Sequence, residues 1–73
     1  MSKKTILVAG GGGFIGGHLV ENLLLKGHTV RSVDIKPLSD WYQIHPEAEN
    51  LQDDLMGKEA CEKAVQGCDL VYN

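Results

Sequence analysis

Glycines gather in one short stretch of this 73-residue chain, and their spacing suits a phosphate-bearing ligand. Six of the nine glycines lie within eight residues, directly after the apolar run at residues 5–9. They fit two dinucleotide-binding patterns, Gly11-x-Gly13-x-x-Gly16 and the wider Gly10-x-x-Gly13-x-x-Gly16. In both patterns one glycine forms a tight turn, a second admits a pyrophosphate and a third lets helix and strand pack closely.

The chemistry expected at this stretch is the binding of a diphosphate group at a helix N-terminus. N–H groups of the first helical turn face the anion, and the helix dipole adds positive potential there. A mononucleotide phosphate loop is disfavoured, because Gly12-x-x-x-x-Gly17 is followed by His18 and Leu19, where such loops carry Lys and then Ser or Thr. ATP hydrolysis is therefore not expected.

An acidic residue stands where a carboxylate can reach an adenosine ribose. Asp34 comes 18 residues after Gly16, near the separation of about 20 that dinucleotide-binding chains have. This carboxylate accepts hydrogen bonds from the ribose diol, but it repels a 2′-phosphate about 4 Å away by roughly 4 kcal/mol per unit charge at an effective dielectric near 20. Arg31 and Lys36 lie nearby in sequence, but one is mid-strand and the other follows the carboxylate. We therefore predict NAD in preference to NADP.

Two further acidic residues, Asp53 and Asp54, follow a weaker strand pattern at residues 48–52. At the carboxyl edge of a sheet, such a carboxylate can accept a hydrogen bond from the adenine amino group. The same residues also suit the N-terminus of a following helix, because Asp is a favourable N-cap. On spacing alone, both interpretations stay open.

These residues need a scaffold, and the hydrophobic pattern predicts alternating strands and helices. Strands are expected at residues 5–9, 29–35 and 48–52 and from residue 68, with helices at residues 14–26 and 58–66. Gly27 and Gly67 end the two helices, and one helical turn is expected around Ser39 to Gln43, within the irregular stretch 36–47. The fold class is α/β, the amino-terminal part of a Rossmann-type doubly wound parallel sheet. Its strand order of 3-2-1-4 puts the glycines at the switch point.

Charge and composition exclude several classes of protein. With a net charge of −3 and a pI near 5.4, the chain has no cluster of Lys and Arg for nucleic acid or an anionic membrane surface. No segment approaches the roughly 20 apolar residues of a membrane span. Cys61 and Cys68 are too few for a disulfide scaffold and lack metal-ligand spacing, so we expect a reduced, cytoplasmic location.

Three features of the chain occur together in one known family. The run Val8-Ala9-Gly10-Gly11-Gly12-Gly13-Phe14-Ile15-Gly16, then Asp34, then the pair Asp54-Leu55 resemble the cofactor signature of the extended short-chain dehydrogenase/reductases, the NAD-dependent epimerases and dehydratases. Ala9 departs from the usual Thr or Ser, which removes a hydroxyl and leaves the glycine spacing intact.

The resemblance implies a set of cofactor contacts. Phe14 and Ile15 line the pyrophosphate through backbone N–H groups, Asp34 binds the ribose, and Asp54 with Leu55 contacts the adenine. The implied NAD-binding residues are Gly10, Gly13, Phe14, Ile15, Gly16, Asp34, Asp54 and Leu55. No catalytic or metal-binding residue is expected in the chain, since Tyr72 has no Lys four residues on and the two cysteines lie in the wrong region.

Within the family, residues 30–36, 41–43 and 71–73 look most like the GDP-mannose 3,5-epimerases. That likeness implies a GDP-mannose-like nucleotide sugar as substrate, epimerised through transient oxidation at C4. For the complete protein we also expect a homodimer. The family's Tyr-x-x-x-Lys motif and acid/base residues come later than residue 73. We therefore expect residues 1–73 to be the amino-terminal part of an NAD-binding domain, truncated before the catalytic region and inactive alone.

Two other interpretations use the same fold. A non-catalytic module that senses dinucleotides or has a structural role would lack Tyr-x-x-x-Lys in the sequence that follows. An FAD-binding half is permitted by Gly11-x-Gly13-x-x-Gly16, but Phe14-Ile15-Gly16 and Asp54-Leu55 disfavour it.

Overall fold

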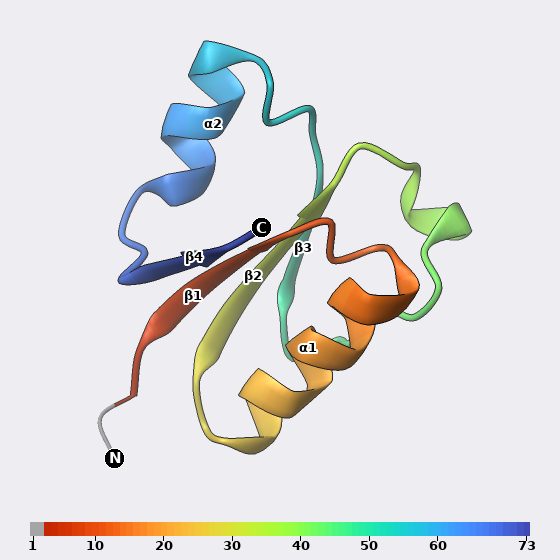
Figure 1. Ribbon diagram of the computed structural model, residues 1–73, viewed down its shortest axis with the longest axis vertical. Coiled ribbons are helices and arrows are strands. Elements are labelled where there is room, and N and C mark those ends of the chain that lie inside the picture. The colour runs from red at the N-terminus through yellow and green to blue at the C-terminus, as the bar shows by residue number, and fades with distance from the viewer. Residues whose placement is uncertain (1–2) are drawn as a thin grey trace.

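The computed structural model describes residues 3–73, and a four-stranded parallel sheet organises them (Figure 1). Along the chain the elements are β1 (Thr5–Ala9), α1 (Phe14–Leu25), β2 (Thr29–Asp34), the 3-10 helix η1 (Leu38–Asp40), β3 (Glu49–Gln52), α2 (Lys58–Val65) and β4 (Leu70–Tyr72). In space the strands run β3-β2-β1-β4, with each neighbouring pair parallel. The predicted α/β class and 3-2-1-4 order are confirmed.

Both faces of the sheet carry packed side chains. Successive residues of a strand point to opposite faces, so the three consecutive buried residues of β1 serve both. This explains why residues 5–9 form a continuous apolar run instead of an alternating one. The cluster on the α1 face consists of Ile6, Val8, Val20, Leu23, Val30 and Ala48. The cluster on the α2 face consists of Leu7, Val33 and Ala64.

The strands differ slightly from their predicted bounds, for local reasons. β2 ends at Asp34, one residue early, because the Asp34 carboxylate accepts the backbone N–H of Lys36 and starts a turn. β4 starts at Leu70, two residues late, because the N–H of Cys68 donates to the carbonyl of Val65 and closes the turn after α2. The two helices begin where the sequence pattern predicts.

The connection from β2 to β3 contains no long helix. η1 supplies the single expected turn, slightly earlier than predicted. Figure 1 shows this connection in green beside the start of α1. Residues 36–43, which we call the strap, are tied to the loop between β1 and α1 by a hydrogen bond from the N–H of Tyr42 to the carbonyl of Gly12.

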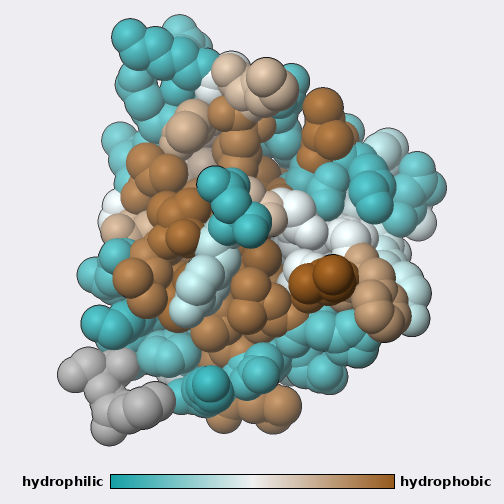
Figure 2. All heavy atoms as spheres, in the orientation of Figure 1, coloured by the Kyte–Doolittle hydropathy of each residue, from teal (hydrophilic) through white to brown (hydrophobic). Residues whose placement is uncertain are grey.

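Apolar side chains remain uncovered around β4. All three residues of β4 are exposed, and Figure 2 shows apolar atoms gathered across the middle of the face that carries this strand. Within residues 3–73, neither helix combines the length and the apolar character that crossing a membrane requires.

Candidate functional site

The glycine loop joins β1 to α1 at the carboxyl edge of the sheet. Gly10 has φ of +85°, a left-handed conformation that glycine adopts without strain. The N–H groups of Gly10 and Gly11 both donate to the carbonyl of Val33, at 2.8 and 3.1 Å, which ties the loop to β2. Gly13 is the N-cap of α1, and its N–H donates to the carbonyl of Gly10 at 3.1 Å. The loop is therefore a closed turn that presents the start of α1.

The space around each glycine distinguishes the two glycine patterns. A Cβ at Gly16 would collide with the carbonyl of Gly10, so this glycine lets α1 approach the loop closely. A Cβ at Gly13 would meet only the Gly10 carbonyl oxygen, at an ordinary 3.5 Å. The protein itself thus leaves room at Gly13, as expected if the space serves a ligand. Gly10 as the turn and Gly16 as the packing residue favour the wider pattern.

Gly11 and Gly12 are glycines for reasons that sequence reasoning missed. A Cβ at Gly11 would collide with the hydroxyl of Ser32, a buried residue of β2. A Cβ at Gly12 would lie 2.8 Å from the indole ring of Trp41 and 3.0 Å from Oδ2 of Asp34. These requirements come from residues 20 or more positions away, so no local pattern reveals them. One sequence signal was available, the sole Trp of the chain within a Pro-containing loop.

The start of α1 has the features of an anion-binding site. No side chain caps it, and its first turn carries no acidic residue. The first intrahelical bond runs from the N–H of Gly17 to the carbonyl of Gly13 at 2.9 Å. Residues 14–16 therefore precede the regular hydrogen bonding of the helix, and their N–H groups point along the axis toward the loop. The side chains of Phe14 and Ile15 are largely exposed. Contacts between a pyrophosphate and their backbone N–H groups remain a prediction.

Asp34 lies beside this loop, as predicted. Its Oδ2 accepts the N–H of Gly12 at 3.0 Å, and its Oδ1 accepts the N–H of Lys36 at 3.1 Å. An ionised carboxylate has about four acceptor sites, so one further hydrogen bond to each oxygen is possible. The carboxylate is thus oriented by the backbone while it keeps capacity for two hydroxyl donors.

The acidic pair after β3 forms a turn and does not cap α2. Gly57 is the N-cap of α2, and no side chain bonds to that end, so the capping interpretation is wrong. Oδ1 of Asp54 instead accepts the N–H of Met56 at 3.0 Å, in the turn that precedes Gly57. The N–H of Asp53 donates to the carbonyl of Asp34 at 3.0 Å, which brings this turn next to the end of β2. Leu55 is half-buried against the α2-face cluster.

Arg31 does not face the loop. Its guanidinium crosses to α2, where Nη1 donates to the carbonyls of Ala64 at 2.6 Å and Gln66 at 2.8 Å, and Nε donates to Glu49 at 2.9 Å. The hydrogen bond with Glu49 raises the pKa of Arg31 above its ordinary value, against an opposing effect of burial. Arg31 is therefore committed to the C-terminus of α2 and is unavailable to a 2′-phosphate beside Asp34.

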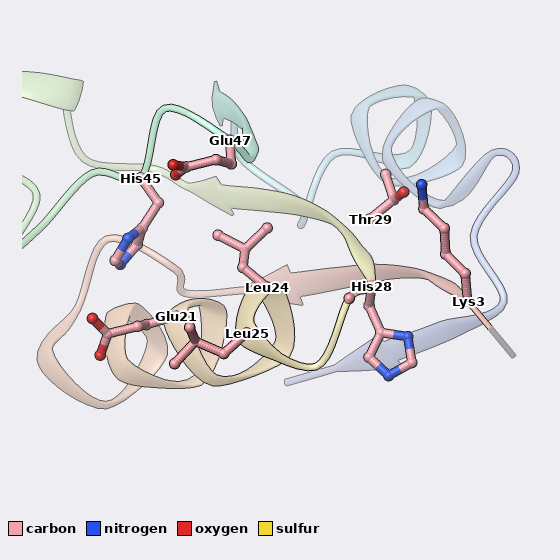
Figure 3. A pocket seen from close by; sticks show the side chains of 9 residues that line it. Lys3, Glu21, Leu24, Leu25, His28, Thr29, His45 and Glu47 are labelled. Carbon is pink, nitrogen blue, oxygen red and sulfur yellow. The ribbon is translucent and has the colours of Figure 1, made fainter. Parts of the chain in front are cut away.

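A hollow of about 530 Å³ lies at the amino ends of the strands, opposite the edge that carries the glycine loop (Figure 3). Its walls come from the start of β2, the end of α1 and the connection before β3, and Figure 3 shows Glu21 with His45 at one end and Lys3 with His28 at the other. Among residues 3–73 no group of three His, Cys, Asp or Glu side chains could hold a metal ion. The glycine loop and Asp34 take no part in this hollow, so the candidate site at the carboxyl edge is separate from it.

Comparisons with known proteins identify a matching family model and several similar proteins. A family model described as "NAD dependent epimerase/dehydratase family" matches residues 6–73. A 3 beta-hydroxysteroid dehydrogenase/Delta 5→4-isomerase of Mycobacterium tuberculosis is 43% identical over 68 residues, which is 93% of this chain and 18% of that protein. UDP-glucuronic acid decarboxylase 1 of Danio rerio is 50% identical over 32 residues, or 44% of this chain and 8% of that protein.

Solved structures resemble the chain along almost its whole length. A mutant uronate dehydrogenase from Agrobacterium tumefaciens, complexed with NAD, superposes with a TM-score of 0.77 and 31% identity, over 96% of this chain and 25% of that one. A second short-chain dehydrogenase/reductase superfamily protein from Agrobacterium tumefaciens, also with bound NAD, gives a TM-score of 0.74 and 30% identity over 92% of this chain. The chain spans about a fifth of the length of the steroid dehydrogenase and of this second structure.

Proposed function

The chain belongs to the NAD-dependent epimerase/dehydratase family, and from that premise we propose that residues 1–73 are the amino-terminal part of the domain with which a larger enzyme binds NAD. The observation that carries the proposal is the pairing of the uncapped start of α1 with the carboxylate of Asp34. Gly12 joins the two, because its N–H donates to Asp34 while it lies in the loop that leads into α1.

Each part of the site has a defined task in this proposal. The N–H groups of Phe14, Ile15 and Gly16 bind the pyrophosphate, which approaches across the open side of Gly13. Asp34 accepts hydrogen bonds from the two ribose hydroxyls. NAD, when bound, supplies hydride transfer to and from a substrate. The acid/base residues that act on that substrate belong to the rest of the protein.

The adenine is assigned to the turn that follows β3. A carboxylate oxygen of Asp54 accepts from the adenine amino group, and the half-buried side chain of Leu55 contacts the ring. The hydrogen bond from Asp53 to the carbonyl of Asp34 supports this assignment, because it keeps the turn next to the ribose site.

The local charges favour NAD over NADP. A 2′-phosphate placed against Asp34 would meet a negative charge, and Arg31 is engaged at the end of α2. Lys36 is exposed and follows the carboxylate, where its backbone N–H donates to Oδ1 of Asp34. Of these two cations, Arg31 is therefore the one that is unavailable to a 2′-phosphate, and the proposed preference for NAD depends chiefly on the charge of Asp34.

For the complete protein we propose a nucleotide-sugar substrate, GDP-mannose-like, epimerised through transient C4 oxidation by a homodimer in the cytoplasm. The likeness of residues 41–43 and 71–73 to GDP-mannose 3,5-epimerases supports the sugar, although none of the relatives named above is such an epimerase. The UDP-glucuronic acid decarboxylase supports a nucleotide sugar in kind. The steroid dehydrogenase matches over only 18% of its length, which does not select a substrate for this protein.

A titration and a turnover assay test the proposal on the complete protein that contains this chain. In calorimetry we expect NAD to bind at least about tenfold more tightly than NADP, which corresponds to about 1.4 kcal/mol, and FAD not to bind. With NAD bound, we expect epimerisation of a nucleotide sugar, read by NMR of the product. Failure to bind NAD contradicts the cofactor assignment. Tight NAD binding without turnover of any nucleotide sugar instead favours a non-catalytic dinucleotide-sensing module.

A further inference from the structure

The strap contains one buried side chain that belongs to neither apolar cluster of the sheet. Trp41 is only 7% exposed, yet it is absent from the clusters on the α1 and α2 faces. Its ring lies against the glycine loop, since a Cβ built on Gly12 would be 2.8 Å from both Cγ and Cδ1 of the indole. The position of Gly12 therefore depends on Trp41.

Trp41 also forms a hydrogen bond with a second residue beside Asp34, Lys36. Its Nε1–H donates to the carbonyl of Lys36 at 2.9 Å, which closes the strap on itself. The neighbouring N–H of Tyr42 donates to the carbonyl of Gly12 at 2.8 Å. The strap therefore contacts the loop twice, through this hydrogen bond and through the Trp41 ring. One indole thus packs on Gly12 and bonds to the carbonyl of Lys36, the residue whose N–H donates to Asp34.

Those two residues are the ones that orient Asp34. The N–H of Gly12 donates to Oδ2 and the N–H of Lys36 donates to Oδ1, so each carboxylate oxygen has one backbone donor. A displacement of either residue would rotate the Asp34 carboxylate or leave one of its oxygens without a hydrogen-bond donor. Because Trp41 packs on the first residue and bonds to the second, the orientation of the carboxylate depends on the indole.

We propose that Trp41 is a positioning residue for the dinucleotide ribose, acting through Asp34. The inference rests on the proposed NAD site and adds to it a residue outside the glycine pattern. A carboxylate already held in its binding orientation loses no side-chain freedom when the ribose arrives, so its hydrogen bonds contribute more to affinity. A residue that merely filled space would instead affect folding and leave the ribose contact as it was.

A double-mutant cycle on the complete protein separates these two roles. NAD is titrated by calorimetry into the Trp41→Ala and Asp34→Ala variants and into the double variant. We expect Trp41→Ala to raise the Kd for NAD about tenfold when Asp34 is present and less than about twofold in the Asp34→Ala background, because residues that act through one another are not additive. Equal losses in the two backgrounds would overturn the proposal.

Trp41→Phe keeps the test decisive if the alanine variant folds poorly. Phenylalanine retains a ring over Gly12 but cannot donate to the carbonyl of Lys36. We expect a smaller rise in Kd, about threefold, that again disappears in the Asp34→Ala background. A rise that persists there overturns the proposal.

Ile44→Ala is the matched control, a truncation of an exposed apolar side chain just beyond the strap. Its Kd should stay within about twofold of the wild type, as for surface substitutions away from special features. A tenfold loss in this variant would assign the effect to the whole connection and overturn the role of Trp41. If Asp34→Ala alone leaves the affinity for NAD unchanged, the ribose site itself fails. Additive losses with a large Asp34→Ala effect refute only the positioning role.

Discussion

At the scale of single residues, Gly13 is a position where the described fold itself has room for a side-chain carbon. Its backbone has φ of −83°, and an added Cβ would meet only the Gly10 carbonyl oxygen at 3.5 Å. We expect Gly13→Ala to change the free energy of unfolding by no more than about 0.5 kcal/mol. Its Kd for NAD should nevertheless rise at least about tenfold, because the methyl group would occupy the path of the pyrophosphate. Thermal unfolding and calorimetric titration measure the two effects.

Two other glycines provide the controls. Gly57 is the N-cap of α2, and a Cβ there would also make an ordinary contact, 3.4 Å from the carbonyl oxygen of Asp54. Gly57→Ala should leave NAD binding as it is in the wild type. Gly16→Ala should destabilise the fold by about 1–3 kcal/mol, because its methyl group collides with the loop carbonyl. Wild-type affinity in Gly13→Ala would mean that this glycine serves only the turn.

In the proposed site, Asp34 discriminates between the two nicotinamide dinucleotides. Asp34→Asn keeps an oxygen for the N–H of Gly12 but removes the negative charge. We expect the Kd for NAD to rise about tenfold, since hydrogen bonds to charged groups contribute about 1.5–3 kcal/mol, and the preference over NADP to shrink. Parallel titrations with both dinucleotides provide the ratio. An unchanged ratio would refute the assignment of Asp34 to the ribose.

At the scale of elements, α2 is short and is held mainly by Arg31. The helix has eight residues, of which only Ala64 is buried. Arg31→Met should keep the aliphatic packing and remove the hydrogen bonds to the carbonyls of Ala64 and Gln66, at a cost of about 2 kcal/mol of folding free energy. Urea unfolding measures the loss. Lys63→Met, which removes an exposed charge from the last turn of the same helix, should have little effect.

The contribution of Arg31 should not depend on pH near neutrality. Its pKa is raised in the folded state, so the associated stability is fully present below the ordinary pKa of an arginine and is lost only as the pH rises through the raised pKa of the folded state. Equal stabilities of Arg31→Met and the wild type, or a difference that vanishes between pH 6 and pH 8, would contradict this account of α2.

Elements with a local sequence signal could be predicted, and those without one could not. The apolar run of β1 and the helical spacing of α1 predict bounds that match the structure within one residue, because burial on the sheet imposes that pattern. The strap has no such pattern. The position of Trp41 is determined by contacts with Gly12, 29 residues earlier, and the engagement of Arg31 by carbonyls more than 30 residues later. The spacing of the chain therefore predicts the glycines and Asp34, whereas Phe14, Ile15, Asp54 and Leu55 come only from the family resemblance. The residues that orient them have no signal of either kind.

At the scale of the whole molecule, the uncovered apolar surface at β4 should control the behaviour of residues 1–73 made alone. Leu70, Val71 and Tyr72 are 41%, 49% and 40% exposed, and β4 has one strand neighbour, β1, in the described chain. Exposed apolar edges of this kind associate with other chains. We expect concentration-dependent self-association in sedimentation velocity and its suppression by Val71→Lys. A monomer at every concentration, already in the unchanged sequence, would contradict the expectation.

The central claim is that NAD binds across the glycine loop at the carboxyl edge of the sheet and not in the hollow at the opposite edge. Hydrogen–deuterium exchange of the complete protein, with and without saturating NAD, tests this claim most directly. Bound NAD should slow exchange of the backbone N–H groups of residues 10–16 and leave His28 and Thr29, which line the opposite hollow, unchanged. Slowed exchange at His28 and Thr29, with the glycine loop unaffected, would contradict the account.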